Sequence, residues 1–286
     1  MAGLAGQDLP AQALYVVGLP IGNAADITLR ALWVLARVDA IAAEDTRVTG
    51  PLLARYGIRT PLLAAHQHNE RAMADAIVAR LQAGERIAVV TDAGTPGVSD
   101  PGARLARAVL DAGLRVVPVP GASSALAALS AAGLEAPRFR FAGFPPTGAR
   151  ERQALLREAA ASTDATVLFE APHRIRTLLT ALSEALPVDR RVVLARELTK
   201  KFETISVHAA GELATLPVEE RGEYVVLIDA AADAAPAALD ADAQQWLFAL
   251  LEELTPARAA ALVARMTGVP RAAVYDAALA AKRQGR

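Results

Sequence analysis

The chain has 286 residues, 53% of them hydrophobic and 21% charged, which is enough apolar material for one large or two ordinary globular domains and excludes a disordered polypeptide. It has no cysteine, which excludes disulfides, thiolate metal sites and a cysteine nucleophile, and no apolar run of the roughly 20 residues that a membrane span needs. The net charge of −1 argues against a protein that coats nucleic acid by general attraction to phosphates, although it leaves room for a local basic face.

Apolar runs alternate with helical patterns along about the first two hundred residues, which predicts an α/β architecture. In the first part, strands are expected at 14–17, 40–43, 61–65, 87–90 and 116–119. Helices are expected at 27–38, from Pro51 to Gly57 behind Thr49 as N-cap, between Asn69 and Gly84, and from Asp100 to Leu110.

A second set of elements follows the turn at Pro120 and Gly121. Its expected strands are 139–144, 166–169, 192–195, 204–207 and 224–228, and its expected helices are 123–132, 153–160 and 175–186. We therefore predict an N-terminal α/β domain over 1–121 and a second α/β domain over 122–230.

The last part of the chain, 231–286, differs in composition. An alanine-rich stretch from Ala230 to Pro236 resembles a linker, and three short helices are expected at 244–254, 256–266 and 270–282. The last two helices have the spacing of a helix-turn-helix. An alanine-rich bundle that only packs on the main body is the other interpretation.

Two loops carry residues suited to a ligand. The loop from Thr91 to Gly102 holds three glycines, two prolines and two aspartates, and it joins a buried strand to a helix, where open α/β sheets bind ligands. Asp92 could accept hydrogen bonds from an amine or hydroxyl, and Asp100 could cap the helix. The loop from Gly18 to Asn23 also has two glycines, but a plain tight turn explains it equally well.

Serines and charged residues follow other strands. Ser123 and Ser124 stand at a helix N-terminus, which suits a carboxylate, although an N-cap explains one of them. The segments 44–47, 170–174 and 196–201 gather acids and bases at one edge of the sheets, where surface ion pairs are the alternative. His66 and His68 are too few for a metal site, so we predict no metal.

Arginines alternate with phenylalanines from 137 to 157. This segment has five arginines against one glutamate, with Phe139, Phe141 and Phe144 between them. The alternation is that of a half-buried strand, and it also suits a basic face for RNA, and both interpretations can hold together.

Taken in order, several segments resemble the tetrapyrrole-methylase superfamily and, within it, the small-subunit ribosomal RNA methyltransferase I family. The matching stretches are VVGLPIGNAADITLRAL, AAEDTR, HQHNE, VVTDAGTPGVSDPG, VPGASSALAAL, LFEAPHR, ARELTKKFE and GEYVVL. Each is modest alone, and the specificity comes from the ordered set. Superfamily members that act on porphyrin or corrin precursors tend to carry Gly-Asp-Pro where this chain has Gly94-Thr95-Pro96, which favours the RNA branch.

The resemblance implies a two-domain tetrapyrrole-methylase-like α/β fold with a small C-terminal helical module, S-adenosylmethionine bound between the two domains, and a homodimer. It also implies methyl transfer to the ribose 2′-oxygen of one cytidine in the decoding region of 16S rRNA, met within the small ribosomal subunit in the cytoplasm. The residues that it places at the cofactor are Leu19, Pro20, Gly94, Thr95, Pro96, Val98, Ser123, Ser124, Phe169, Ala195 and Glu223.

Because a ribose hydroxyl is a weak nucleophile, a nearby carboxylate or amine is expected to take its proton. The candidates, chosen for their position in motif loops, are Asp45, Glu70 and Lys200. Arginine holds phosphate bidentately, and the predicted RNA contacts are Arg47, Arg138, Arg140, Arg150 and Arg174. The C-terminal helices are a second predicted RNA contact.

Two alternatives remain open at this stage. One is a methyltransferase for a tetrapyrrole or another small acceptor, which would act without RNA. The other is a non-catalytic ribosome-assembly factor, which the intact-looking loops at Gly94 and Ser123 argue against.

Overall fold

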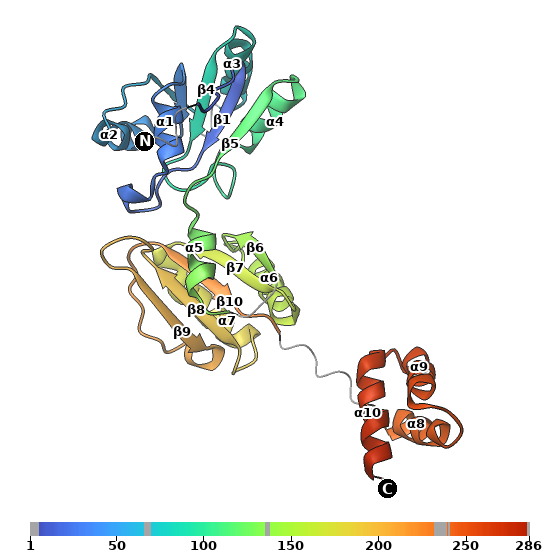
Figure 1. Ribbon diagram of the computed structural model, residues 1–286. Coiled ribbons are helices and arrows are strands. Elements are labelled where there is room, and N and C mark those ends of the chain that lie inside the picture. The colour runs from blue at the N-terminus through green and yellow to red at the C-terminus, as the bar shows by residue number, and fades with distance from the viewer. Residues whose placement is uncertain (1–5, 66–69, 135–137, 232–238, 240, 285–286) are drawn as a thin grey trace. The chain divides into compact units, whose positions relative to one another are not determined.

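The structure is a computed structural model that describes residues 6–65, 70–134, 138–231, 239 and 241–284 (Figure 1). Residues Met1–Asp229 form one compact unit and Ala230–Arg286 form another. The first unit contains two five-stranded sheets with helices packed on them, which confirms the predicted α/β class. A division of this unit into domains at residue 121 stays a prediction.

The first sheet consists wholly of parallel strands in the order β3-β2-β4-β1-β5. Its strands are β1 (Ala13–Val17), β2 (Ala40–Ala43), β3 (Leu62–Ala64), β4 (Arg86–Val90) and β5 (Arg115–Val119). Two helices, α1 (Leu29–Leu35) and α2 (Thr46–Arg55), cover one face, and α3 (Glu70–Gln82) and α4 (Ala103–Asp111) cover the other. Since all five strands run the same way, the loops after their carboxyl ends share one edge.

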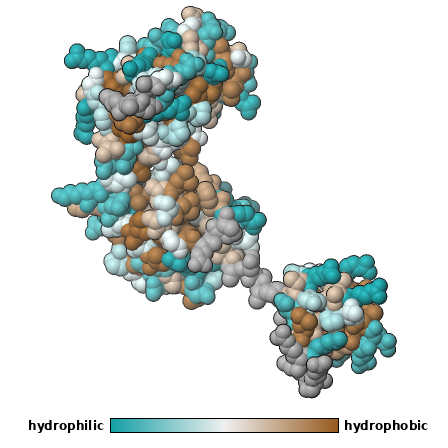
Figure 2. Space-filling view, viewed as in Figure 1, coloured by the Kyte–Doolittle hydropathy of each residue, from teal (hydrophilic) through white to brown (hydrophobic). Residues whose placement is uncertain are grey.

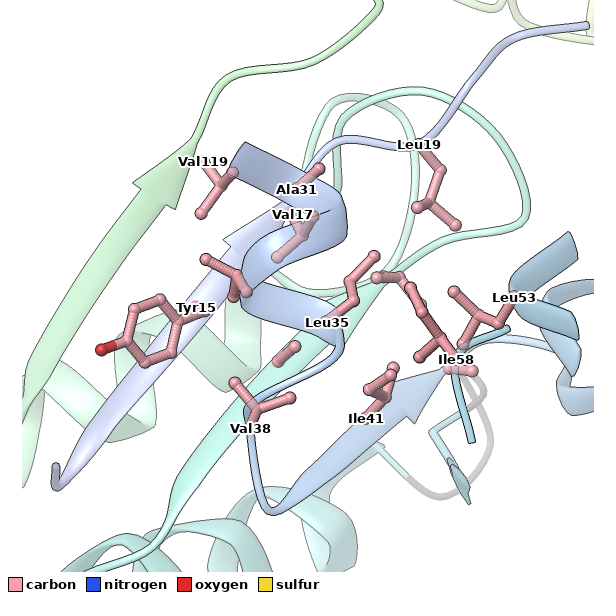
Figure 3. Close-up of a cluster of buried hydrophobic side chains, with 14 of the residues drawn as sticks. Tyr15, Val17, Leu19, Ala31, Leu35, Val38, Ile41, Leu53, Ile58 and Val119 are labelled. Atoms are coloured by element: carbon pink, nitrogen blue, oxygen red, sulfur yellow. The ribbon is translucent and has the colours of Figure 1, made fainter. Parts of the chain in front are cut away.

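Strand β1 is buried on both faces. Tyr15 belongs to the same buried cluster as Leu35 of α1 and Leu53 of α2 (Figure 3), whereas Leu14 belongs to the cluster on the side of α3 and α4. This burial explains why β1 is a continuous apolar run rather than an alternating one. The Tyr15 hydroxyl is satisfied because it donates to the carbonyl of Pro10 at 2.7 Å.

Helix α2 begins earlier than predicted. The carboxylate of Asp45 accepts the N–H of Arg47 at 2.8 Å and so caps a helix that begins at Thr46. The predicted N-cap, Thr49, is instead buried within the helix, and Pro51 also lies inside it rather than at its first position.

Helix α4 begins later than predicted, at Ala103. The N–H of Gly97 donates to the carbonyl of Pro101 at 3.1 Å, and Gly102 turns the chain with a φ of 120°. Only glycine adopts such a conformation without strain. Asp100, which was predicted to open this helix, is therefore left in the loop before it.

The second sheet is mixed, in the order β6-β7-β10-β8-β9. Its strands are β6 (Phe139–Gly143), β7 (Ala165–Glu170), β8 (Arg191–Arg196), β9 (Thr204–Ala209) and β10 (Tyr224–Ile228). Only β6 and β7 pair in parallel, and the other pairs are antiparallel. Helices α6 (Ala149–Ala161) and α7 (Ile175–Ala185) pack on one face, and α5 (Ser124–Ala131) packs on the other. The short 3₁₀ helices are η2 (Ala24–Asp26), η3 (Pro172–Arg174) and η4 (Ala210–Glu212).

The two sheets meet where the loops after β1 and β5 cross. A Cβ atom on Gly18 would lie 2.8 Å from the Cα of Gly121, so the two backbones touch with no room for a side chain. The Thr95 hydroxyl donates to the carbonyl of Ala122 at 3.1 Å, and Ile21 joins the core between α5 and the second sheet. The glycine-containing first loop thus serves as a contact between the sheets.

The described part of the C-terminal unit contains three helices, α8 (Ala241–Glu253), α9 (Pro256–Thr267) and α10 (Arg271–Gln284), around a small core of its own. Gly268, with a φ of 74°, ends α9 in the left-handed conformation and turns the chain into α10. Hydrophilic residues occupy much of the visible face of this unit (Figure 2). The predicted linker, 230–236, lies largely outside the described residues. Among the described helices, none has both the length and the apolar character needed to span a bilayer.

Candidate functional site

A cavity of about 470 Å³ lies in the first unit beside the carboxyl edge of the first sheet. The loop after β4 forms one wall. Residues at the end of β7 and at the start of β10, in the second sheet, form the opposite wall. Volumes of roughly 300–1,000 Å³ are usual for sites that hold small molecules. The two sheets therefore make this site together.

Three carboxylates from the first sheet line the cavity: Glu44 after β2, and Asp92 and Asp100 in the loop after β4. Backbone contacts fix two of them, because Asp92 accepts the N–H of Asp45 at 3.1 Å and Glu44 accepts the N–H of Asp92 at 3.4 Å. Partial burial raises the pKa of both Glu44 and Asp92. The negative charges gathered at this wall make it attractive to a cation, which in turn favours the ionised form of each carboxyl.

Asp100 is the most perturbed of these acids. Partial burial, and then the charges of Glu44, Asp92 and Glu223, raise the pKa of its carboxyl to about 6. Its side chain caps no helix, since α4 begins behind Gly102. A carboxyl with such a pKa exchanges its proton close to neutral pH.

Aromatic side chains from the second sheet form the opposite wall. Phe169, at the end of β7, makes edge contacts with Phe141 and Phe144, at ring-centre distances of 4.8 and 5.6 Å. Phe144 and Phe169 both line the cavity, and Phe144 is 53% exposed. Such faces suit a flat ring that stacks or packs against them.

An ion pair anchors the loop that carries Phe144. The Glu170 carboxylate is 1% exposed and lies 3.2 Å from the Arg174 guanidinium, which also donates to the carbonyl of Pro145 at 2.6 Å. Burial raises the pKa of Glu170 even though the Ala171 N–H and Arg174 act in the opposite direction. Arg174 therefore joins the end of β7 to the loop after β6.

Lys200 joins two glutamates at the rim of the cavity. Its ammonium donates to Glu197 at 2.9 Å and to Glu223 at 2.8 Å. Partial burial lowers the pKa of Lys200, but the hydrogen bonds and the negative charges of the two glutamates together outweigh it, and the net pKa is raised. The Lys200 side chain also fills the space beside Gly22, where a Cβ atom would collide with it.

The loop that presents Lys200 is strained. Glu197 and Thr199 both have positive φ angles, 51° and 66°, although neither is glycine. Its contacts hold it there, since Thr199 accepts the N–H of Asn23 from the first loop at 3.0 Å. Strain of this kind persists where surrounding contacts impose it, and it is common at functional sites.

The structure brings most of the predicted cofactor residues together. Those that line the cavity are Gly94, Thr95, Val98, Ser123, Ser124, Phe169 and Glu223. Those that do not are Leu19, Pro20, Pro96 and Ala195, all of which are buried. Leu19 supports the wall from behind, because its N–H donates to the carbonyl of Gly94 at 2.8 Å.

The two serines at the start of α5 are in a position to bind a ligand in the cavity. Ser123 is the N-cap residue, but its side chain makes no capping hydrogen bond, so the simple cap interpretation does not account for it. Ser123 and Ser124 both line the cavity at the N-terminus of α5, where backbone N–H groups lack helical partners.

Two of the three predicted proton acceptors, Asp45 and Lys200, are poorly placed to act as a base. Hydrogen bonds from Arg47 lower the pKa of Asp45 to about 2, and neither Asp45 nor Lys200 lines the cavity. Glu70 is the first residue of α3, but its side chain lies outside the described residues. The roles of all three stay predictions.

Four of the five predicted RNA contacts are bound to carboxylates. Arg47 pairs with Asp45, Arg138 with Asp164, Arg140 with Glu158, and Arg174 with Glu170. Arg150 is exposed on α6 and forms no ion pair with a described residue. The alternating segment thus forms strand β6 and its flanking residues, and Arg138 and Arg140 are partly neutralised by their carboxylate partners.

The two histidines considered for a metal, His66 and His68, lie outside the described residues, as does the predicted N-cap Asn69. Within the described ranges no three histidine or acidic side chains are grouped so as to hold a metal ion.

Among the cavity acids that the first sheet contributes, sequence reasoning missed two. Glu44 lies in a segment noted for its charges, yet only its neighbours were chosen, and Asp100 was interpreted as a helix cap. The available signal was position, since both follow strands of the parallel sheet directly or by one loop.

Comparison with known proteins gives the family. The profile of the tetrapyrrole (corrin/porphyrin) methylases matches residues 13–216, and the profile of the RsmI C-terminal HTH domain matches 237–282. A relative from Neisseria meningitidis serogroup B, "Ribosomal RNA small subunit methyltransferase I", is 47% identical over 273 residues, or 94% of each chain. The chain belongs to the ribosomal RNA small subunit methyltransferase I family. Members of this family from Pseudomonas aeruginosa (44% identical, covering 97% of this chain and 100% of the relative) and Escherichia coli O157:H7 (46%, covering 93% and 94%) carry the same name.

Solved structures agree on the fold of the family. The methyltransferase CobJ superposes with a TM-score of 0.58 at 25% identity, covering 77% of this chain and 94% of its own. The uroporphyrin-III-C-methyltransferase of Thermus thermophilus superposes with a TM-score of 0.55 at 24% identity, covering 76% and 94%. These likenesses confirm the predicted tetrapyrrole-methylase-like fold.

Proposed function

We propose that the chain transfers a methyl group from S-adenosylmethionine to the ribose 2′-oxygen of a cytidine in the decoding region of 16S rRNA. Family membership makes the chain a methyltransferase that uses this donor. The names of its relatives support small-subunit rRNA as the acceptor. The ribose oxygen and the particular cytidine rest on the motif resemblance. The observation that carries the proposal is the shared cavity with its acidic and aromatic walls.

The cavity residues fit the donor. When bound, S-adenosylmethionine supplies an electrophilic methyl group on a positively charged sulfur. Glu44, Asp92 and Asp100 favour a cation at their wall. Ser123 and Ser124, at the N-terminus of α5, suit a carboxylate, and the Phe169 wall suits an adenine ring.

Asp100 is the residue best suited to take the proton from the ribose hydroxyl. A catalytic base works best when its pKa is close to the working pH, and the pKa of Asp100 is about 6. With a pKa of about 2, Asp45 is too weak a base, and Lys200 is held in its charged form by two glutamates. This assignment adds Asp100 to Asp45, Glu70 and Lys200 as candidates and ranks it first.

The decisive experiment incubates labelled S-adenosylmethionine with small ribosomal subunits that lack their modifications, and then maps the labelled nucleotide. Label on a single cytidine ribose supports the proposal. Label on a base, or on a tetrapyrrole in the absence of RNA, contradicts it. Binding of the donor without any transfer favours a non-catalytic assembly factor.

We also propose that the enzyme acts in the cytoplasm as a homodimer and meets rRNA within the assembled small subunit. These three statements follow from the resemblance. Sedimentation of the purified chain tests the dimer, and a comparison of protein-free rRNA with subunits as methyl acceptors tests the third.

A further inference from the structure

We infer that the C-terminal unit grips RNA phosphates in a groove formed by α9 and the start of α10, through Arg258, Arg265 and Arg271. The inference rests on the proposed function, because that function supplies the RNA. It names a surface of the C-terminal unit that binds the same substrate.

The geometry of α9 puts two of these arginines on one face. Arg258 and Arg265 are seven residues apart, or about two helical turns, and both line an open groove of about 510 Å³. The turn at Gly268 then brings Arg271, in the first turn of α10, to the same groove. Small side chains lie between them, since Ala257 and Ala261 also line the groove. A sugar-phosphate backbone can therefore approach the helix closely.

No residue that the structure describes balances the charges in the groove. All three arginines are exposed, and none forms an ion pair with any residue that the structure describes. The residues lining the groove include no acid. Arg271 stands in the first turn of a helix, where the helix dipole disfavours a cation, so its charge does not serve the stability of α10.

The chemistry of the groove favours phosphate. A guanidinium group matches phosphate oxygens with two parallel hydrogen bonds, and three such groups along one groove suit a chain of phosphates. Residues 237–282 match a helix-turn-helix profile, and such motifs place one helix against nucleic acid. Here the arginines are divided between the two helices of the pair α9 and α10, rather than confined to the second.

The first test neutralises the three arginines together, as Arg258→Gln, Arg265→Gln and Arg271→Gln. The control removes the same charge from three other exposed arginines, as Arg55→Gln, Arg59→Gln and Arg107→Gln. The affinity of each full-length variant for unmodified small subunits is measured over a range of KCl concentrations. Melting temperature and affinity for S-adenosylmethionine are measured in parallel, to show that the fold and the cavity are intact.

We expect the groove variant to bind subunits at least tenfold more weakly, with the slope of log K against log salt reduced by about two, since three phosphate contacts are lost. The control should stay within about twofold of the unaltered protein. Equal behaviour of the two variants overturns the inference. Methyl transfer by the unaltered protein tests the proposed function separately, so the two failures are distinguishable.

A second test asks what lies in the groove. The chain has no cysteine, so Ala261→Cys provides a single thiol on the groove floor for a tethered iron–EDTA cleaver. Localised cleavage of 16S rRNA in the complex with subunits supports binding of RNA phosphates in the groove. Contact with ribosomal proteins and no rRNA cleavage overturns it.

Discussion

Charged side chains at the cavity and in the C-terminal groove are held in different ways. At the cavity, Lys200 lies between Glu197 and Glu223, so these charges stabilise one another in fixed positions. In the groove of α9 and α10, the three arginines have no carboxylate among the described residues to hold them. Charges that position a small donor are fixed before it arrives, whereas charges that meet an RNA surface are left available for it. The following predictions test this difference.

The largest effect is expected from Asp100→Asn. If Asp100 takes the proton, kcat should fall by about 10²–10⁴-fold, a larger effect than the loss of affinity for S-adenosylmethionine that follows from removing one of the three carboxylates at the cation-binding wall. For the unaltered enzyme, kcat/KM should rise with pH through about 6, because the raised pKa keeps the carboxyl protonated and inactive below that value. Single-turnover methylation at several pH values measures both.

The matched control for this test is Asp111→Asn, at the end of α4 and outside the cavity. It should leave the rate and its pH dependence unchanged. A normal rate in Asp100→Asn would assign the proton to another group.

Removal of the C-terminal unit is expected to give the next largest effect. Truncation after Ala230 should weaken binding to small subunits more than tenfold, because the groove arginines are lost with it. Affinity for S-adenosylmethionine should not change, since every residue lining the cavity belongs to the first unit. Titration calorimetry with the donor and filter binding with subunits measure the two affinities, and an unchanged subunit affinity would remove the division of roles between the units.

A substitution at the contact between the sheets should affect stability. Gly18→Ala places a methyl group 2.8 Å from Gly121 and should lower the free energy of unfolding by about 1–3 kcal/mol. Gly50→Ala, within α2, meets only a side-chain carbon of Leu62 at 3.6 Å and should raise it by up to about 1 kcal/mol. Denaturant titration compares the two, and equal effects would contradict a backbone contact at Gly18.

The smallest effect is expected from Lys200→Met. Without its ammonium, the carboxylates of Glu197 and Glu223 lose their shared partner at the cavity rim, and affinity for S-adenosylmethionine should fall about fivefold to tenfold. Lys200→Arg should restore part of it. The pH dependence of the rate should keep its shape if Lys200 positions the rim, and a changed shape would instead make Lys200 the base.

The strands were predicted well because burial leaves a direct mark on sequence. The run at 13–17 is apolar throughout since β1 is covered on both faces. Helix starts were less accurate. Thr49 and Asp45 are both good caps, and the choice between them depends on a hydrogen bond to Arg47 that spacing does not reveal.

The site was predicted in outline. The loops at Gly94 and Ser123 could be chosen from their composition, and they do line one cavity. The raised pKa of Asp100 could not, because it arises from burial and then from the charges of Glu44, Asp92 and Glu223, which the fold brings near from three different segments. Arg138 and Arg140 were chosen for their charge and their alternation with phenylalanines, and sequence does not show that Asp164 and Glu158 neutralise them.

The contact between Gly18 and Gly121 also limits how this sequence can vary. Where backbone touches backbone, no side chain is available to vary, and a larger residue at either position forces the sheets apart. New acceptor specificities must therefore come from loops at the edge of the cavity, such as the loop that carries Phe144, while the contact between Gly18 and Gly121 is kept. A library that keeps residues 18 and 121 and varies the Phe144 loop should give a higher fraction of folded, donor-binding variants than one that varies all of them.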